Sequence, residues 1–492
     1  MERVGDQARP DRVVVIGAGL SGLAAAHRIE ERSRSRGRSV EVQVLEAKDR
    51  VGGVIWTDHE DGFTIEGGPD SFITNKPWGL DLCHRLGLDD QLIATDAGHR
   101  RSFVVRGGKL APVPEGFVLM TPHRLAPLLA SPILSWRGKL RFLMDLVIPR
   151  RDPDDGGEES LASFVRRRLG REALDRLVQP LVAGIYTADP NDLSIKATLP
   201  QFLAMESEHR SLILAAWRES RQGGARELLR NASGARYGMF VSLADGMEAL
   251  PRALARALEP GTVRTGAAVR RISRDEASGV WLIEMLDGPP IEADAVVMAT
   301  EAHVAARLLD AHDAALAHQL RAIPYAGSVI VNIAYRRDQI NHPLDGFGAV
   351  VPAVEERSIL AVSFLSVKFP GRAPAGSVLM RVFLGGAMNP SALELDDDAI
   401  ESVVERELGA LVGAAGPPLF SRIGRHPRSM PQYNLGHMER VAAIRRHLSK
   451  YAGLHLAGVA YDGVGIPDCI HAAESTADSL LDALAIAHAS AA

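Results

Sequence analysis

A glycine-rich turn near the amino terminus has the residue types and spacing that bind a phosphate. Gly17, Gly19 and Gly22 form the pattern Gly-x-Gly-x-x-Gly, and the positions between them hold Ala18, Leu20 and Ser21. Gly17 would permit a tight turn, Gly19 would let a pyrophosphate approach the backbone, and Gly22 would let a helix pack closely on a strand. The pattern alone is weak evidence, because glycine-rich hexapeptides also arise by chance.

The residues on both sides of this turn predict a βαβ unit. The β-branched run Arg12–Ile16 is typical of a buried parallel strand, residues 20–31 of an alanine-rich helix, and Val40–Leu45 of a second strand. Glu46 ends the second strand, where a carboxylate can accept hydrogen bonds from both ribose hydroxyls of a dinucleotide. The alternative is that Glu46 merely caps the strand.

The residues that follow Glu46 distinguish FAD from NAD. Arg50 and the pair Gly52-Gly53 come next, flanked by Ala47 and Val54, and a second tight turn contains Gly67, Gly68, Pro69 and Asp70. This arrangement resembles the extended dinucleotide signature of the FAD-dependent amine oxidase and porphyrinogen oxidase superfamily, in which the second turn passes near the flavin. The glycines would let the backbone follow a pyrophosphate, and Arg50 would hold the loop or face a phosphate. The resemblance implies FAD as the cofactor.

Two later segments are predicted to join the same sheet. Ala295–Thr300 and Leu454–Gly458 are apolar runs that end in small residues, as expected where the carboxyl end of a parallel strand meets a ligand. We also expect cofactor contacts from Val269, Ala299, Thr300, Gly458, Val459, Val464, Gly465 and Ile466.

The sequence offers no second site for a nicotinamide. The pair Gly463 and Gly465 lacks a third glycine, and Gly413 and Gly416 follow a predicted helix. We expect the reduced flavin to be reoxidised by dioxygen or a quinone, which would make the protein an oxidase.

The composition is that of a globular protein of about three domains, since the chain has 492 residues. Its 56 Lys and Arg against 61 Asp and Glu give a formal charge of −5, which disfavours a nucleic-acid binder. Only Cys83 and Cys469 occur, so a disulfide framework is excluded and a reducing, cytoplasmic compartment is expected. No histidine or cysteine pair has ligand spacing, so no metal is expected.

Membrane contact is an open question for residues 117–134. No apolar run reaches the roughly 18 residues that a spanning helix needs, and residues 1–10 lack the apolar core of a signal peptide. The stretch 117–134 is apolar but contains His123, Arg124 and three prolines. It is either a packed helical region with loops or a surface that rests on a bilayer.

The carboxyl-terminal motif is the most specific feature. Residues 458–470 read Gly-Val-Ala-Tyr-Asp-Gly-Val-Gly-Ile-Pro-Asp-Cys-Ile, which closely resembles the motif of soluble-type, FAD-dependent protoporphyrinogen and coproporphyrinogen oxidases. Similar matches occur at 66–72, 208–212, 369–372 and 431–437, and the resemblance covers about residues 11–485. Val459 departs from the family, where many members have Asn. Cys469 is either a reactive thiolate at a helix start or a small buried residue.

The resemblance implies oxidation of a porphyrinogen in heme synthesis, with dioxygen as acceptor and hydrogen peroxide as product. It places Phe383 against the macrocycle, although Phe383 could equally be an ordinary core residue, and it places Gly184 where space is needed over the ring. Arg101 and Lys76 are candidates to bind the propionates, or else solvated charges. Asp70 stands where some relatives have Arg. The preference between the two porphyrinogens stays open.

The resemblance also implies an α/β and α+β fold in three parts. A discontinuous, Rossmann-like FAD-binding domain would comprise residues 11–102, 236–305 and 446–492. A helical, membrane-associated domain would span 103–212, and a mixed-sheet substrate-binding domain 213–235 and 306–445, with a linker or exposed loop at 149–160. Further expected partners are the inner face of the cell membrane, neighbouring heme-pathway enzymes and a second copy of the chain.

Two alternative functions stay open. A flavin-dependent amine oxidase or desaturase would have the same fold, but an amine oxidase needs a paired aromatic cage, and the carboxyl-terminal motif offers only Tyr461. A non-catalytic flavin-binding or membrane-surface scaffold would give a colourless preparation whose melting temperature ignores FAD.

Overall fold

The computed structural model describes residues 9–152, 157–221 and 239–491. Residues 1–8 of the amino-terminal segment 1–10 therefore lie outside the described residues. So do parts of the segments 149–160, 213–235, 236–305 and 446–492.

A five-stranded parallel sheet forms the centre of the first half of the molecule. Its strand order is β12 (Val263–Arg264), β2 (Val40–Leu45), β1 (Asp11–Ile16), β16 (Ala295–Met298) and β22 (Leu454–Leu456). The strands predicted from both ends and the middle of the chain are thus confirmed as neighbours. Because the connections leave β1 in opposite directions, a crevice forms beyond its carboxyl end.

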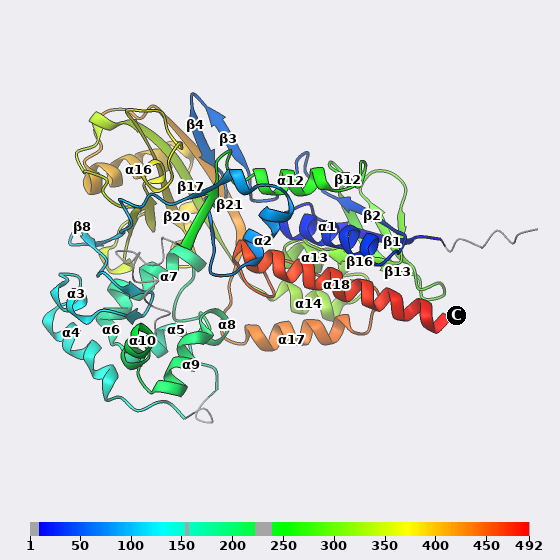
Figure 1. The fold of residues 1–492 in the computed structure, drawn as a ribbon, viewed down its shortest axis with the longest axis horizontal. Helices are drawn as coiled ribbons and strands as arrows, with labels where there is room; N and C mark the ends of the chain where they lie inside the picture. The colour runs from blue at the N-terminus through cyan, green and yellow to red at the C-terminus, as the bar shows by residue number, and fades with distance from the viewer. Residues whose placement is uncertain (1–8, 153–156, 222–238, 492) are drawn as a thin grey trace, which may run out of the picture.

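Helices cover both faces of this sheet. One face holds α1 (Leu20–Ser35), α12 (Ala249–Ala257) and α18 (Ile466–Ala491), and Figure 1 shows α1 (blue) beside α18 (red). The other face holds α13 (Ala302–Leu309), α14 (Ala314–Arg321), α17 (His437–Leu448) and the antiparallel strands β13 (Val269–Arg274), β14 (Trp281–Met285) and β15 (Ile291–Ala293). Alternation along β1 explains the two layers, since Val13 and Val15 join the first core and Val14 and Ile16 the second.

A second, seven-stranded sheet forms the other half. Its order is β21 (Phe420–Pro431), β17 (Tyr325–Arg336), β20 (Ser377–Gly385), β19 (Ala361–Ser363), β18 (Gly348–Val350), β7 (Phe103–Arg106) and β8 (Lys109–Pro112). All pairs are antiparallel except β18 with β7. One face packs on α16 (Asp397–Val412).

The packing cuts across the predicted domain ranges. Strands β7 and β8 come from the range 103–212, yet they extend the seven-stranded sheet, because Phe103 and Val105 bury their side chains in its core. Helices α13, α14 and α17 come largely from 306–445 and pack on the five-stranded sheet. The domain division itself stays a prediction.

Short helices around a separate core make up most of residues 117–221. They are α3 (Leu125–Ala130), α4 (Trp136–Leu143), α5 (Leu161–Arg168), α6 (Arg171–Ala173), α7 (Gln179–Tyr186), α8 (Ile195–Thr198), α9 (Pro200–His209) and α10 (Leu212–Arg221). A π-helical turn, Leu174–Val178, stands between α6 and α7, directly before Pro180. Since proline lacks an N–H and crowds the preceding turn, it accounts for the widened helix. None of the helices in the described part of the chain is both long and apolar enough to span a membrane.

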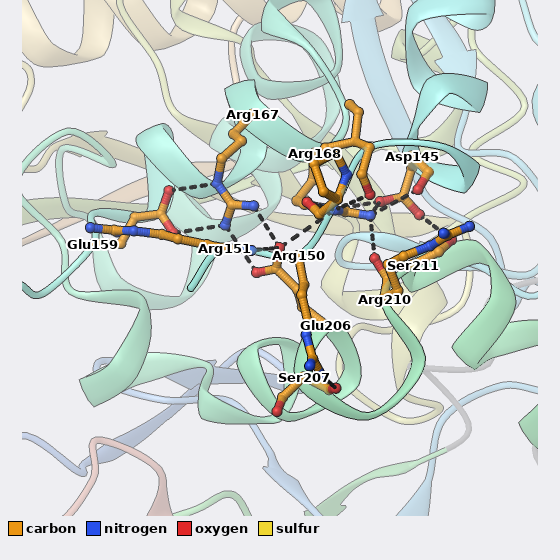
Figure 2. Close-up of polar contacts among 12 residues, drawn as sticks. Asp145, Arg150, Arg151, Glu159, Arg167, Arg168, Glu206, Ser207, Arg210 and Ser211 are labelled. Atoms are coloured by element: carbon orange, nitrogen blue, oxygen red, sulfur yellow. Dashed lines mark hydrogen bonds and ion pairs between the residues drawn. The ribbon is translucent and has the colours of Figure 1, made fainter. Parts of the chain in front are cut away.

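Buried charges fix these helices to one another. The Arg168 guanidinium is fully buried, donates to Asp145 Oδ1 at 2.7 Å and donates to the carbonyl of Arg210 at 2.6 Å. Figure 2 shows its neighbour Arg167 reaching both Glu159 and Glu206. Leaving one of these buried charges without its partner would destabilise the fold by several kcal/mol. The ion pairs therefore keep the ends of α4, α5 and α9 in one relative arrangement.

Smaller elements complete the fold. They are the hairpin β3 (Thr57–Glu60) and β4 (Phe63–Glu66), the sheet of β5 (Phe72–Ile73), β11 (Phe240–Leu243) and β6 (Leu92–Ala94), the pair β9 (Phe117–Val118) and β10 (Thr121–Pro122), and the helices α2 (Trp78–Arg85) and α15 (Leu365–Lys368).

Candidate functional site

The three glycines of the amino-terminal turn have different surroundings. Gly17 has φ +102°, and a Cβ there would lie 2.8 Å from the Ala299 carbonyl oxygen. A Cβ on Gly22 would lie 1.9 Å from the Gly17 carbonyl oxygen. Around Gly19 the nearest atom to such a Cβ is the Cα of Gly53, at 4.0 Å. Gly17 and Gly22 therefore serve close packing, whereas Gly19 borders open space that a pyrophosphate can enter.

The start of α1 faces this space as an anion site. Gly19 is the N-cap without a capping side chain, and the first turn holds no acidic residue. The first N–H groups of the helix are thus left for a ligand, and the helix dipole favours a negative one. The Gly52 N–H donates to the Ala18 carbonyl at 2.8 Å, so the second glycine pair lies against the turn.

Glu46 is positioned at the end of β2 by the backbone around it. Its carboxylate accepts the Ala18 N–H at 2.8 Å and the Lys48 N–H at 2.9 Å, and the residue is 8% exposed. Each carboxylate oxygen has a further lone pair, so Glu46 can still accept ribose hydroxyls. The Ala267 N–H donates to the Glu46 carbonyl, which brings the start of β13, with Val269, to this end of the sheet.

Arg50 acts on the loop itself. Its guanidinium donates to the Gly53 carbonyl at 2.9 Å and to the Val51 carbonyl at 3.2 Å. Of the two predicted roles, the structure thus places Arg50 on the backbone of the glycine loop, next to the exposed Val54.

The turn Gly67–Asp70 lies against the same loop. A Cβ on Gly68 would lie 2.0 Å from the Val54 carbonyl oxygen, and one on Gly67 would lie 1.7 Å from the Trp56 ring. Only glycine permits this approach. The nucleotide turn, the Gly52-Gly53 pair and the Gly67-Gly68 pair thus form one continuous strip of backbone.

Three strands of the seven-stranded sheet hold this turn from behind. Asn332 Nδ2 on β17 donates to the Glu66 carbonyl at 3.1 Å, and His426 Nε2 on β21 lies 3.0 Å from the Gly67 carbonyl. Arg381 on β20 donates to the Gly68 carbonyl. We call these three contacts the carbonyl clamp. They join the two halves of the molecule where the predicted cofactor site begins.

Buried ion pairs surround the clamp. Asp70 lies between Lys368 Nζ at 2.8 Å and Arg381 Nη1 at 3.2 Å. Burial alone would raise the pKa of Asp70, but the two cations hold it well below its usual range. Glu66 lies 3.4 Å from Arg372, and burial raises the pKa of Glu66 despite that cation.

The carboxyl-terminal loop is held by one side chain. The Tyr433 hydroxyl donates to the Val459 carbonyl at 2.7 Å and accepts the Gly463 N–H at 2.8 Å. The ring of His437 stacks on Tyr433 with 4.0 Å between centroids. The loop leads through Val464 and Gly465 into α18, which begins at Ile466. Burial raises the pKa of the Cys469 thiol to about 12, so Cys469 is a buried thiol and not a thiolate.

The predicted cofactor residues converge on one edge of the five-stranded sheet. Glu46 follows β2, Gly17 follows β1, Ala299 and Thr300 follow β16, and Gly458 comes shortly after β22. A Cβ on Gly458 would lie 3.9 Å from the Thr300 carbonyl oxygen. Since these four strands are successive neighbours, the residues fit a single elongated dinucleotide.

Two of the substrate candidates come from α7, which carries Gly184, and from the seven-stranded sheet, which carries Phe383. The space beside Gly184 is open, with Val350 Cγ1 the nearest atom at 4.0 Å from an added Cβ. Phe383 on β20 is half-buried, with the Arg381 guanidinium 5.3 Å from its ring centre. The Ala387 N–H donates to the Thr187 carbonyl, which brings the ends of β20 and α7 together.

The two predicted propionate-binding cations already have acidic partners. Lys76 Nζ lies 2.5 Å from Asp468 in the first turn of α18. Arg101 pairs with Asp345 and donates to its carbonyl at 2.6 Å. A substrate carboxylate would have to share or displace these partners.

Sequence reasoning missed the clamp residues and Tyr433. A signal existed, because Asn332 and Arg381 are polar residues inside otherwise apolar strands, and such positions need buried partners. Tyr433 was part of the matched segment 431–437 but had no role assigned. The described residues contain no group of three or more His, Cys, Asp or Glu that could hold a metal.

Comparison with known proteins gives consistent results. A family profile described as flavin containing amine oxidoreductase matches residues 20–481. The chain is 36% identical to coproporphyrinogen III oxidase of Propionibacterium freudenreichii, over 97% of this chain and 92% of the relative. It is 33% identical to coproporphyrinogen III oxidase of Bacillus subtilis, over 93% and 95% of the two chains. A crystal structure from Exiguobacterium, assigned to protoporphyrinogen oxidase, superposes with a TM-score of 0.83 at 30% identity, covering 96% and 99% of the chains.

The different surroundings of Gly19 and Gly22 predict different effects for an alanine substitution at each position. Gly19→Ala should leave the melting temperature of the apoprotein unchanged but weaken FAD binding more than tenfold, about 1.4 kcal/mol, because its methyl group enters the ligand space. Gly22→Ala should lower the melting temperature of the apoprotein, because its methyl group overlaps the Gly17 carbonyl. Calorimetry and FAD titration measure both. Unchanged FAD affinity in Gly19→Ala would contradict the placement of the pyrophosphate.

His437 predicts a pH-dependent loss of stability. Burial, with a further contribution from Arg440, lowers the pKa of His437 from 6.5 to about 4. The unfolded state therefore binds more protons between pH 6.5 and 4, so stability falls as the pH drops through this window, by roughly 3 kcal/mol from this residue.

His437→Phe keeps an aromatic ring on Tyr433 and removes the titration. Urea unfolding at pH 7 and pH 4.5 should show a smaller loss on acidification in this variant than in the wild type. The exposed His59→Gln serves as control and should keep the wild-type difference. An equal loss in His437→Phe and in the wild type would refute the assignment.

Proposed function

The chain belongs to the flavin containing amine oxidoreductase family, with FAD as its cofactor, and from this premise we propose that it oxidises a porphyrinogen to the porphyrin. The porphyrinogen is coproporphyrinogen III or protoporphyrinogen IX, and the names of the two coproporphyrinogen III oxidase relatives make coproporphyrinogen III the first to test. The observation that carries the proposal is the convergence of the nucleotide turn, Glu46 and the carboxyl-terminal loop on one edge of a sheet, with an open space beside Gly184.

Dehydrogenation of the macrocycle is the chemistry that bound FAD supplies. A porphyrinogen loses six hydrogen atoms, in three two-electron steps, and three dioxygen molecules take them up as three hydrogen peroxide molecules. The protein's own part is to orient the macrocycle and to exclude competing reactants. Dioxygen is the proposed acceptor because the sequence lacks a second nucleotide motif for a nicotinamide.

Residues on three elements would hold the macrocycle. Phe383 offers a half-buried aromatic face, Gly184 leaves room over the ring, and Val464 of the carboxyl-terminal loop packs, as Val350 does, on the helical core. Lys76 and Arg101 are proposed for the propionates through shared ion pairs with Asp468 and Asp345. Coproporphyrinogen carries four carboxylates and gains more from such cations than protoporphyrinogen with two.

Turnover of purified, FAD-loaded protein tests this function. Coproporphyrinogen III or protoporphyrinogen IX should give porphyrin fluorescence and about three peroxides per porphyrin. Gly184→Leu should lower kcat/KM more than tenfold with unchanged FAD content, because its side chain fills the substrate space. Ala410→Leu, exposed on α16, adds bulk elsewhere and should leave turnover unchanged. A yellow protein that leaves both porphyrinogens intact but oxidises an amine would favour the amine oxidase instead.

Peripheral membrane contact is a second part of the proposal. Trp136, Leu140, Met144 and Val147 recur at helical spacing along α4 and the turn after it, with 66%, 57%, 48% and 69% exposure. We call these four residues the α4 stripe. It lies at the outer end of the molecule, at lower left in Figure 1.

The α4 stripe ends at a basic pocket of about 420 Å³. Val147, Arg150, Arg210 and Arg218 are among its lining residues, which also include Glu208, and Figure 2 shows Arg150 beside Ser207 and Arg210 beside Ser211. Exposed apolar residues beside cations suit an anionic bilayer surface. The proposal includes a cytoplasmic location at this surface, where neighbouring heme-pathway enzymes or a second copy could associate.

Vesicle binding tests the membrane contact. Replacing Trp136 and Leu140 with Ser should weaken binding to phosphatidylglycerol vesicles, measured by sedimentation, more than tenfold. Burial of each apolar side chain in the bilayer would contribute about 1.5–3 kcal/mol to the binding free energy. Leu286→Ser, at a site 61% exposed directly after β14, is the control and should bind like the wild type. Equal binding of the double variant and the wild type would refute the contact.

A further inference from the structure

Five ionisable side chains lie buried behind the turn Gly67–Asp70. Glu66, Arg372 and Arg381 are at most 1% exposed. The side chains of Asp70 and Lys368 are each 12% exposed. This group, which we call the buried charge cluster, comes from β4, the turn itself, α15, the segment after it and β20.

The cluster carries more positive than negative charge. Its two carboxylates, Glu66 and Asp70, face three cations, Lys368, Arg372 and Arg381. The two arginines balance the two carboxylates, and Lys368 therefore supplies an excess of at least one positive charge. Any proton held by Glu66, whose pKa is raised by burial, would increase the excess.

The charged groups around the cluster are themselves paired, neutral or exposed. Glu248, which shares Thr57 with Glu66, pairs with Arg252 at 3.1 Å. His426 contacts the turn, and burial lowers its pKa, so it is neutral near pH 7. Asp245 faces Arg372 and Lys48 faces His426, but both are exposed, opposite in sign and screened by water.

The cluster stands directly behind the predicted flavin path. Arg381 donates to the Gly68 carbonyl, and Gly68 packs on Val54, which follows the Gly52-Gly53 pair. Gly53 in turn lies against Gly19. On its other side Arg381 lies 5.3 Å from the ring centre of Phe383, the candidate substrate contact. The positive charge is therefore buried, held by a hydrogen bond to the backbone, and close to where the cofactor and the substrate would meet.

We propose that the buried charge cluster stabilises reduced FAD relative to oxidised FAD, with Lys368 supplying the excess charge and Asp70 limiting it. The proposal rests on the family's flavin and not on the porphyrinogen assignment. Reduction adds electron density to the flavin, and a fixed positive charge in a medium of low dielectric favours it without reorganisation. Lys368, Arg381 and Asp70 thus act as positioning residues that tune the cofactor.

Two substitutions separate this role from a structural one. Lys368→Met removes a positive charge and keeps the length of the side chain, whereas Asp70→Asn removes a negative charge and keeps the shape. Both substitutions break the same ion pair, so structural damage would shift the midpoint potential of bound FAD in the same direction in both variants. The charge mechanism demands shifts of opposite sign.

The measurement is the midpoint potential of bound FAD, equilibrated with a reference dye without oxygen or porphyrinogen. Lys368→Met should lower the ratio of affinities for reduced over oxidised FAD about tenfold, which is about 30 mV for a two-electron couple. Asp70→Asn should raise the ratio about tenfold, and the double variant should return close to the wild type. Shifts of equal sign, or ratios within twofold of the wild type, would overturn the proposal.

Control variants keep the result decisive. Lys109→Met, on the exposed edge strand β8, removes a charge far from the turn and should leave the potential unchanged. Lys368→Arg keeps the charge and should restore the wild-type value. If Lys368→Met does not fold, the sign of the Asp70→Asn shift alone decides. Since no porphyrinogen is present, failure here is distinct from failure of the proposed activity.

Discussion

The carbonyl clamp is the constraint that the rest of the site depends on. Buried backbone carbonyls need hydrogen-bond donors, and those of Glu66, Gly67 and Gly68 receive them from three neighbouring strands of the seven-stranded sheet. The turn that contacts the glycine loops of the five-stranded sheet is therefore fastened to the other half of the molecule. Cofactor and substrate regions are aligned because one segment of backbone belongs to both.

A second fastening holds the carboxyl-terminal side. Tyr433 sits just after β21, the strand that also carries His426, and its hydroxyl bridges the two ends of the loop 459–463. Strand β21 thus contributes to both walls of the site, although it contains no nucleotide-binding motif. Tyr433 holds the loop through its backbone groups and makes no use of the side chain at Val459, a position at which many members of the resembled family have Asn.

The sequence predicted the parts of the site that follow from local pattern. The strand, glycine turn and helix at 12–31, and the strands at 40–45, 295–300 and 454–458, were identified from periodicity and small residues, and they occupy one sheet. It did not predict Asn332, His426 or Arg381 as clamp residues, because their roles arise only when strands distant in sequence meet. Strands β7 and β8, within the range 103–212, were missed for the same reason. Each has only four residues, and their apolar side chains are buried only once the strands pair with the rest of the sheet.

The order of the strands in the five-stranded sheet bears on how the protein matures. Gly17 and Gly458 each follow a strand of this sheet at the same edge, yet they are separated by most of the sequence. The ribosome must synthesise residues 454–491 before β22 and α18 can dock, so a shorter nascent chain has no finished pocket to offer. Loading of the flavin is thus a late event, and folding that relies on such distant pairings is slow.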